Sequence, residues 1–300
     1  MKKQKQAYLY AVIAVLFWST VASVFKITLG YMDVFELLFF SSLTSVVFLF
    51  LLLLVQKKMK LLRTFCAKDF FHSAALGFLN PFLYYIVLFK AYDLLRAQEA
   101  LALNYTWPVV LALLSIPLLK QKMKLRSIIA IAISFIGAFV IAMRGNILSF
   151  HFTNATGVLI ALGSTVIWSL FWIYNVKDRR DETVKLFLNF CFGFIFIFIT
   201  MLLTKRIRIP DLRGFVGAGY VGLFEMGITF ILWLKALQLS KTTAKVGNLI
   251  YLSPFISLII ISRVVGEKIL LSTIGGLVLI IAGIILQTKN GKGTDKKVTP

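Results

Sequence analysis

A single acidic residue interrupts one of the long apolar stretches of this 300-residue chain. Glu225 lies within residues 214–234, which contain no other Asp, Glu, Lys or Arg. A carboxylate at the centre of a bilayer costs about 2.5–3.5 kcal/mol on insertion scales, so it must face a cavity or a polar partner. Glu225 could therefore bind the ammonium group of a substrate or take up a proton. Alternatively, it could pair with a buried polar neighbour and hold helices together.

Prolines mark other places where an apolar helix could open. Asn80 precedes Pro81, and Pro108 and Pro254 lie inside later apolar stretches. Proline removes one backbone hydrogen bond and frees a carbonyl. Freed carbonyls that line a cavity could bind polar groups of a substrate, or the proline could only kink its helix.

Two asparagines lie close to matching tyrosines. Asn104 directly precedes Tyr105, and Asn248 lies one turn before Tyr251. Each tyrosine begins a Tyr-x-x-Pro segment, so the tyrosine and the proline share a helix face. The two amides could orient a carboxylate or an amide of a substrate, or they could join helices by hydrogen bonds.

Aromatic residues are frequent in the same stretches. They include Trp18, Tyr84, Tyr85, Tyr105, Trp107, Trp168, Trp172, Trp233 and Tyr251. An aromatic cavity suits an aromatic substrate by stacking or an amine by cation–π attraction. Each residue alone could equally belong to a lipid-facing belt or to packing between helices.

Five charged residues lie at the ends of apolar stretches. They are Lys26, Lys90, Glu99, Lys235 and Lys245. They are candidates for gates that open and close access to a central cavity, or they are helix ends in contact with water.

The elements that carry these residues are ten apolar runs of near-uniform length. The runs span residues 7–25, 37–55, 70–89, 100–119, 127–143, 155–176, 186–204, 214–234, 246–262 and 269–288. Each is close to the ~20 residues that cross a hydrocarbon core as a helix. Their apolar character is continuous rather than alternating, so helices are expected and strands are not. The sequence predicts an all-α membrane protein with ten transmembrane helices.

The basic composition fits this class. The formal net charge is +21, but 59% of the residues are hydrophobic, which leaves no soluble domain to bind nucleic acid. Lys and Arg collect in cytoplasmic loops of membrane proteins. Most of the 33 basic residues fall on one side if both termini are cytoplasmic. We therefore expect a multi-pass protein of the cell (inner) membrane with cytoplasmic termini and a polar tail at 289–300.

The chain also contains an internal repeat. Residues 84–91 match residues 230–236, which aligns Lys90 with Lys235 and Asn80 with Glu225. Trp18-Ser19 recurs as Trp168-Ser169, and the Tyr105 segment matches the Tyr251 segment. Five spans form each unit, 1–146 and 155–288, so the second unit enters the membrane from the opposite side. Inverted repeats of this kind are typical of secondary transporters with a site between the halves.

Several short motifs keep a distinctive order along the chain. They are Phe17-Trp18-Ser19-Thr20 with Lys26, the two Tyr-x-x-Pro segments, Ile136-Gly137-Ala138 and Gly266-Glu267. In this order the chain resembles the drug/metabolite transporter superfamily, in its ten-helix EamA-type branch. The tryptophan and Tyr-x-x-Pro motifs are similar to those of bacterial exporters of aromatic amino acids. The resemblance implies that helices 1–4 and 6–9 surround a central cavity while helices 5 and 10 pack together.

The expected function is secondary transport of small metabolites, amino acids or related amines, by alternating access around an aromatic cavity, with export as the direction. The expected partners are a small-molecule substrate and the lipid bilayer. Protons could be the coupling ion, and facilitated diffusion or exchange is equally compatible with the sequence. Carriage of nucleotide-type or anionic metabolites by Lys26 and Lys90 is an alternative, as is a channel or a membrane-embedded enzyme. We expect no enzyme activity and no cofactor or metal, because the sequence contains no phosphate-binding loop, zinc motif or nucleophile elbow.

Overall fold

The computed structural model describes residues 2–119, 125–145, 154–204, 210–240 and 248–288, and within them every regular element is a helix. The elements are α1 (Lys2–Thr28), α2 (Val34–Val55), η1 (Met59–Thr64), α3 (Ala67–Gly77), η2 (Phe78–Leu83), α4 (Tyr84–Leu94), α5 (Ala97–Asn104), α6 (Trp107–Leu119), α7 (Leu125–Ala142), α8 (Ala155–Lys177), α9 (Glu182–Thr204), α10 (Leu212–Tyr220), η4 (Val221–Glu225), α11 (Ile228–Leu239), η5 (Asn248–Leu252), α13 (Ser253–Ile260), η6 (Ile261–Val265) and α14 (Leu271–Thr288). Here η1 and η5 are 3₁₀-helical, whereas η2, η4 and η6 are π-helical.

Across the described residues, ten apolar helical segments follow one another in the order expected from the sequence. Seven are long and apolar enough to cross a membrane: Lys3–Thr28, Val34–Val55, Ala67–Leu94, Ala97–Leu118, Ala155–Asn175, Glu182–Thr204 and Leu212–Ala236. Three shorter ones are Ile128–Ala142, Leu249–Val265 and Leu271–Leu286. The predicted class, an all-α multi-pass membrane protein, is confirmed.

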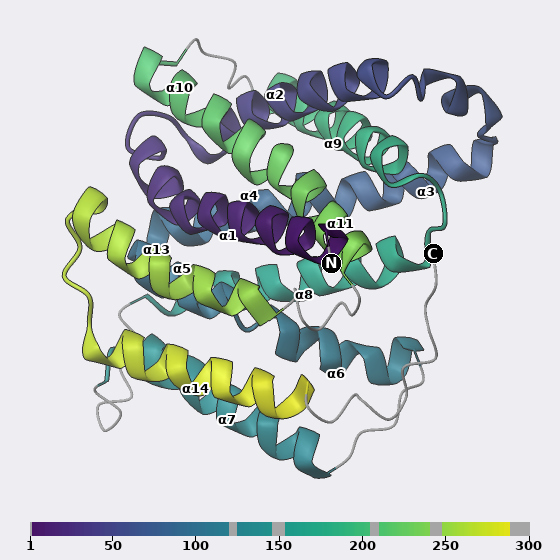
Figure 1. The fold of residues 1–300 in the computed structure, drawn as a ribbon. Helices are drawn as coiled ribbons and strands as arrows, with labels where there is room; N and C mark the ends of the chain where they lie inside the picture. Colours follow the sequence, from purple (N-terminus) through teal and green to yellow (C-terminus); the bar gives the residue numbers. More distant parts are fainter. Residues whose placement is uncertain (1, 120–124, 146–153, 205–209, 241–247, 289–300) are drawn as a thin grey trace. The chain divides into compact units, whose positions relative to one another are not determined.

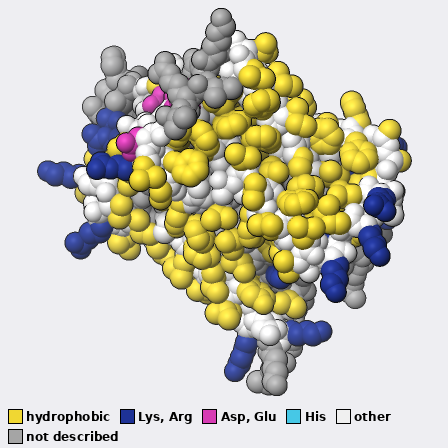
Figure 2. All heavy atoms as spheres, turned by 90° about the horizontal axis from the view of Figure 1, so that it is seen from above, with side chains coloured by type: hydrophobic (Ala, Val, Ile, Leu, Met, Phe, Trp, Pro, Cys, Tyr) yellow, Lys and Arg dark blue, Asp and Glu magenta, His cyan; other side chains and the backbone are white. Residues whose placement is uncertain are grey.

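Large apolar side chains remain exposed on the long helices. On α2 they include Val47, Leu51 and Val55, and on α9 they include Phe198 and Leu203, which is 79% exposed. Figure 2 shows hydrophobic side chains covering much of one face, with Lys and Arg near its edges. Such a surface is unfavourable in water and suits contact with lipid.

The helices group into two compact units, and each unit takes segments from both predicted repeats. Unit 1 comprises Met1–Phe89 and Arg180–Gly266, and unit 2 comprises Lys90–Arg179 and Glu267–Pro300. In unit 1, α1 packs against α11 and α13, while α9 packs against α2, α3 and η2. In unit 2, α8 packs against α5 and α6, and α7 packs against α14.

Small residues let the helix backbones of unit 1 approach closely. A Cβ atom at Gly77 of α3 would lie 2.3 Å from the Asn189 carbonyl of α9, and one at Gly222 would lie 2.3 Å from the Ser41 carbonyl of α2. In lipid, where there is little hydrophobic drive between helices, such close packing is a main source of helix association.

In unit 2, α7 packs along α14, and the two run side by side in Figure 1. Gly137 and Gly276 face each other at this crossing, since a Cβ on either would lie 2.5 Å from the carbonyl of the other. One turn along, Ser134 Oγ donates to the Ile280 carbonyl at 3.2 Å. The fifth and tenth spans therefore pack together, as the family resemblance implied.

This crossing generates a stability prediction. Gly276→Ala places a methyl group against the Gly137 carbonyl and should cost about 1–3 kcal/mol, as overpacking of a close contact does. Gly275→Ala is the matched control, because a Cβ there meets nothing within 4 Å. Thermal unfolding in detergent should show a lower midpoint for Gly276→Ala only; equal midpoints for both variants would contradict the tight crossing.

Candidate functional site

The two residues that the repeat aligns, Asn80 and Glu225, both lie in helix interruptions. Asn80 is in η2, with Pro81 next to it, and its φ of −150° and ψ of 119° are not helical. Glu225 closes η4, which links α10 to α11. π-Helical turns inside longer helices are frequent at functional sites, because they leave backbone groups without their usual partners. The repeat therefore places a polar side chain at a break in each of two matched spans.

Neutral side chains from two other helices adjoin Glu225. Glu225 is 9% exposed, and the hydroxyl of Tyr85, on α4, donates to its Oε1 at 3.0 Å. The indole of Trp18, on α1, is close enough to interact with the same carboxylate. Neither side chain carries a positive charge, so these contacts stabilise the carboxylate without neutralising it.

Aromatic rings adjoin this carboxylate. Trp18 lies 5.4 Å from Trp233 and 6.1 Å from Phe230, measured between ring centroids. Tyr85 lies 4.9 Å from Tyr84 and is fully buried. Trp18, Tyr84 and Glu225 thus belong to one cluster within unit 1, together with Tyr85 and Trp233, which the sequence had indicated only as members of its larger aromatic set.

Asn80 itself is completely buried. Among the residues that the structure describes, neither its Nδ2 nor its Oδ1 has a hydrogen-bond partner. Asn189 of α9, whose carbonyl is close to Gly77, shares both properties. Buried amides usually find partners, so these two contribute unused hydrogen-bonding capacity to unit 1.

A matching serine contact occurs in both units. In unit 1, Ser19 Oγ lies 3.2 Å from Ser253 Oγ, and Ser253 directly precedes Pro254. In unit 2, Ser169 Oγ donates to the Trp107 carbonyl at 3.1 Å, and Trp107 directly precedes Pro108. Each Trp-Ser motif therefore contacts the residue before the proline of a Tyr-x-x-Pro segment, as two equivalent repeats would.

The remaining predicted residues of unit 2 lie around this second contact. Asn104 ends α5, and its Nδ2 donates to Ser164 Oγ of α8 at 3.0 Å. Tyr105 and Pro108 are half-buried, and Trp168 packs edge-to-face on Trp172 at 5.7 Å. These five predicted residues occupy one region of unit 2, around the junction of α5 and α6 with α8.

The comparisons with known proteins agree with this architecture. The model of the EamA-like transporter family matches residues 5–143 and 155–288. The chain belongs to the EamA-like transporter family. It is 25% identical over 303 residues to a protein named "Uncharacterized transporter" from Clostridium kluyveri, covering 98% of this chain and 96% of that protein. It is 26% identical over 221 residues to "Uncharacterized transporter YvbV" from Bacillus subtilis, covering 71% and 70%.

A solved crystal structure shares the fold. It aligns with a TM-score of 0.66 at 19% identity, covering 95% of this chain and 97% of that one. Membership of a transporter family, together with relatives named as transporters, makes this chain a membrane transporter and not an enzyme.

The gate candidates of this EamA-like transporter differ in their exposure and in their ion pairs. Lys90 Nζ lies 2.6 Å from Asp93 on an exposed helix surface. Glu99 is 3% exposed and forms an ion pair with Arg144, within unit 2. Lys26 is half-buried in the last turn of α1.

The remaining predicted residues belong to α11 or follow it in the sequence. Lys235 is exposed on α11. Lys245 falls outside the described residues, as does the side chain of Asn248, while Tyr251 is half-buried and Pro254 is buried. In the described segments, no group of three or more His, Cys, Asp or Glu comes together to hold a metal ion.

The contact between Tyr85 and Glu225 can be measured by a double-mutant cycle. Tyr85→Phe removes a donor from a buried carboxylate, and its cost should shrink when Glu225→Gln is already present. The expected coupling is about 1.5–3 kcal/mol, the range for a hydrogen bond to a charged group. Thermal unfolding of the four proteins in detergent gives this value.

The matched control for this cycle pairs Glu225→Gln with Tyr220→Phe. The Tyr220 hydroxyl lies 2.7 Å from Thr20 Oγ1, so its removal should show coupling below ~0.5 kcal/mol. Equal coupling in both cycles would mean that Tyr85 does not hold Glu225.

Proposed function

We propose that this transporter carries amino acids or related amines, aromatic amino acids among them, and that Glu225 receives the ammonium group. The observation that carries the proposal is a buried carboxylate that accepts a hydrogen bond from the neutral Tyr85 hydroxyl and adjoins the neutral Trp18 indole. Because these groups leave its charge uncompensated, a cationic group of a substrate, or a proton, would find a favourable position there.

The rings beside Glu225 support the same substrate class. Trp18 and Trp233 lie near each other, and an indole face attracts a cation or stacks on an aromatic side chain. The carboxylate can therefore bind the ammonium group of an aromatic amino acid, while the indoles bind its aromatic side chain. An anionic metabolite would be repelled by Glu225.

The proposed mechanism is alternating access with export as the direction. The breaks at η2 and η4 divide two repeat-matched spans into shorter helices, and such discontinuous spans surround the substrate in many transporters with inverted repeats. We place the protein in the cell (inner) membrane with cytoplasmic termini, because that orientation puts most Lys and Arg inside. Protons are the proposed coupling ion, with Glu225 as the group that exchanges them.

Carriage of nucleotide-type or anionic metabolites is the second candidate, and it depends on Lys26 and Lys90. The structure gives it less support, because Lys90 is exposed and paired with Asp93.

Transport measurements in proteoliposomes test the proposal. Labelled amino acids, aromatic ones included, should enter in a saturable manner, and Glu225→Gln should lower the rate about 10–100-fold through loss of a charge-assisted contact. Dependence on an imposed pH gradient would identify protons as the coupling ion. Glu182→Gln is the control, because Glu182 is a partly exposed carboxylate paired with Lys185.

Unchanged kinetics in the Glu225→Gln variant would remove this residue from the mechanism. Saturable uptake of nucleotides or other anions, without uptake of amino acids, would favour the second candidate.

A further inference from the structure

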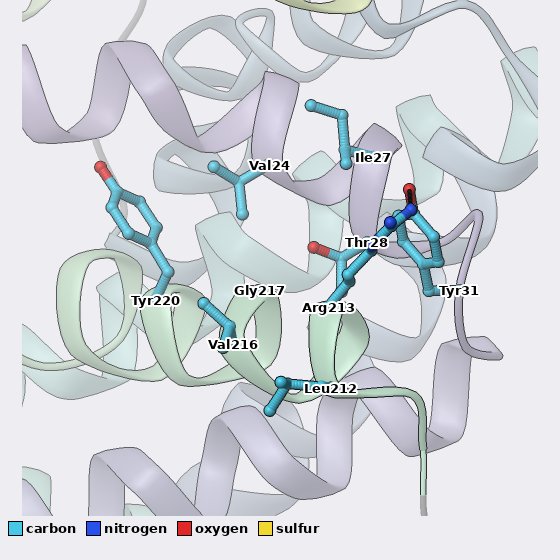
Figure 3. Close-up of a pocket in the computed structure, with 9 residues that line it drawn as sticks. All are labelled: Val24, Ile27, Thr28, Tyr31, Leu212, Arg213, Val216, Gly217 and Tyr220. Carbon is cyan, nitrogen blue, oxygen red and sulfur yellow. Dashed lines mark hydrogen bonds between the residues drawn. The ribbon is translucent and has the colours of Figure 1, made fainter.

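A groove of about 550 Å³ lies in unit 1, where the end of α1 meets the start of α10, and its lining includes none of Glu225, Tyr85 and Trp18. Figure 3 shows the residues that line it: Val24, Ile27, Thr28, Tyr31, Leu212, Arg213, Val216, Gly217 and Tyr220. The proposed transport mechanism uses none of these side chains, so the groove needs its own explanation.

The walls of the groove are almost entirely apolar. Val24 and Ile27 belong to α1, and Leu212 and Val216 belong to α10. Leu212 is 74% exposed and Val216 is 62% exposed, so this apolar surface is open to the surroundings of the protein. An open apolar groove between two membrane helices has the chemistry of a site for a hydrocarbon chain.

Gly217 brings the two helices together at the base of the groove. A Cβ atom there would lie 2.2 Å from Thr28 Oγ1, so only glycine permits this approach of α10 to α1. The side chains on either side of the contact then stand apart and leave the groove between them, as Figure 3 shows for Val24 and Val216.

One end of the groove carries a positive charge. Arg213 Nη1 donates to Tyr31 Oη at 3.3 Å, and the guanidinium lies 5.6 Å from the tyrosine ring centroid. A guanidinium has five N–H donors and binds phosphate well, so Arg213 can serve a phosphate while Tyr31 positions it. The carboxylate of Asp211 accepts the Arg213 backbone N–H as the cap of α10, and it is the acidic neighbour in this turn.

We propose that the groove binds an anionic membrane phospholipid. One acyl chain lies against the apolar walls formed by α1 and α10, and the phosphate contacts Arg213. Charge complementarity and the apolar, laterally open walls select a lipid rather than a water-soluble metabolite.

Native mass spectrometry of the purified full-length protein with added phosphatidylglycerol tests the site. Arg213→Gln removes the phosphate contact, and Val216→Trp fills the groove with a larger side chain. Both variants should retain about 10-fold less phosphatidylglycerol than the parent. Arg263→Gln is the matched control, since Arg263 is an exposed arginine on η6, and this variant should retain the parental amount.

Three comparisons decide among other occupants. Diacylglycerol, which lacks the phosphate, should bind about 10-fold less well than phosphatidylglycerol. Glycerophosphoglycerol, which lacks the acyl chains, should fail to displace the lipid. Equal lipid retention by the parent and both groove variants would overturn the proposal, as would displacement of the lipid by an amino acid. Monodisperse elution with an unchanged melting temperature verifies that Arg213→Gln is folded, so that variant keeps the test decisive if Val216→Trp is not.

Discussion

A carboxylate inside an apolar membrane helix has to be surrounded by donors, and the arrangement of unit 1 meets this constraint around Glu225. The Tyr85 hydroxyl donates to it from α4, and α1, which carries Trp18, packs against the break at η4. The break itself leaves backbone carbonyls without their usual partners. Ser45 of α2 donates to the Met226 carbonyl at 3.2 Å, and Thr229 donates to the Phe224 carbonyl. Glycines at the contacts between helices allow the approach that these short polar side chains need.

The helix breaks in the two repeats also bear on transport. A π-helical turn or a proline places a polar side chain at the middle of a span while apolar helical segments continue on both sides. The repeat provides this twice, with Asn80 in one copy and Glu225 in the other. It also provides the two serine contacts, Ser19 with Ser253 and Ser169 with Trp107, each beside a proline. Two matched helix breaks, each with a polar side chain, could supply the contacts that a carrier makes with a small molecule. This arrangement is consistent with membership of a transporter family.

The sequence predicted the ten apolar segments and the interruption at Pro81, because hydrophobic length and proline chemistry act locally. It did not predict the π-helical turn at 221–225, which contains no proline and depends on how α10 packs against α2. It indicated Tyr84 and Tyr85 equally, because adjacent residues on a helix point in different directions and only the packed structure shows that Tyr85 is the one that meets Glu225. Trp233 was among the aromatic residues that the sequence indicated, but the break between η4 and α11 means that spacing alone could not link it to the Glu225 cluster. The exact partners Ser253 and Arg144 depend on contacts between distant segments, which spacing alone does not reveal.

The most direct measurement of the central claim is a binding titration that compares an aromatic amino acid with its N-acetyl derivative, which lacks the ammonium group. If Glu225 receives the ammonium, acetylation should weaken binding to the parent protein about 10-fold or more and should make little difference in Glu225→Gln. Equal binding of the two ligands by the parent would contradict the account. So would full discrimination between them by Glu225→Gln, because the ammonium would then be read by another group.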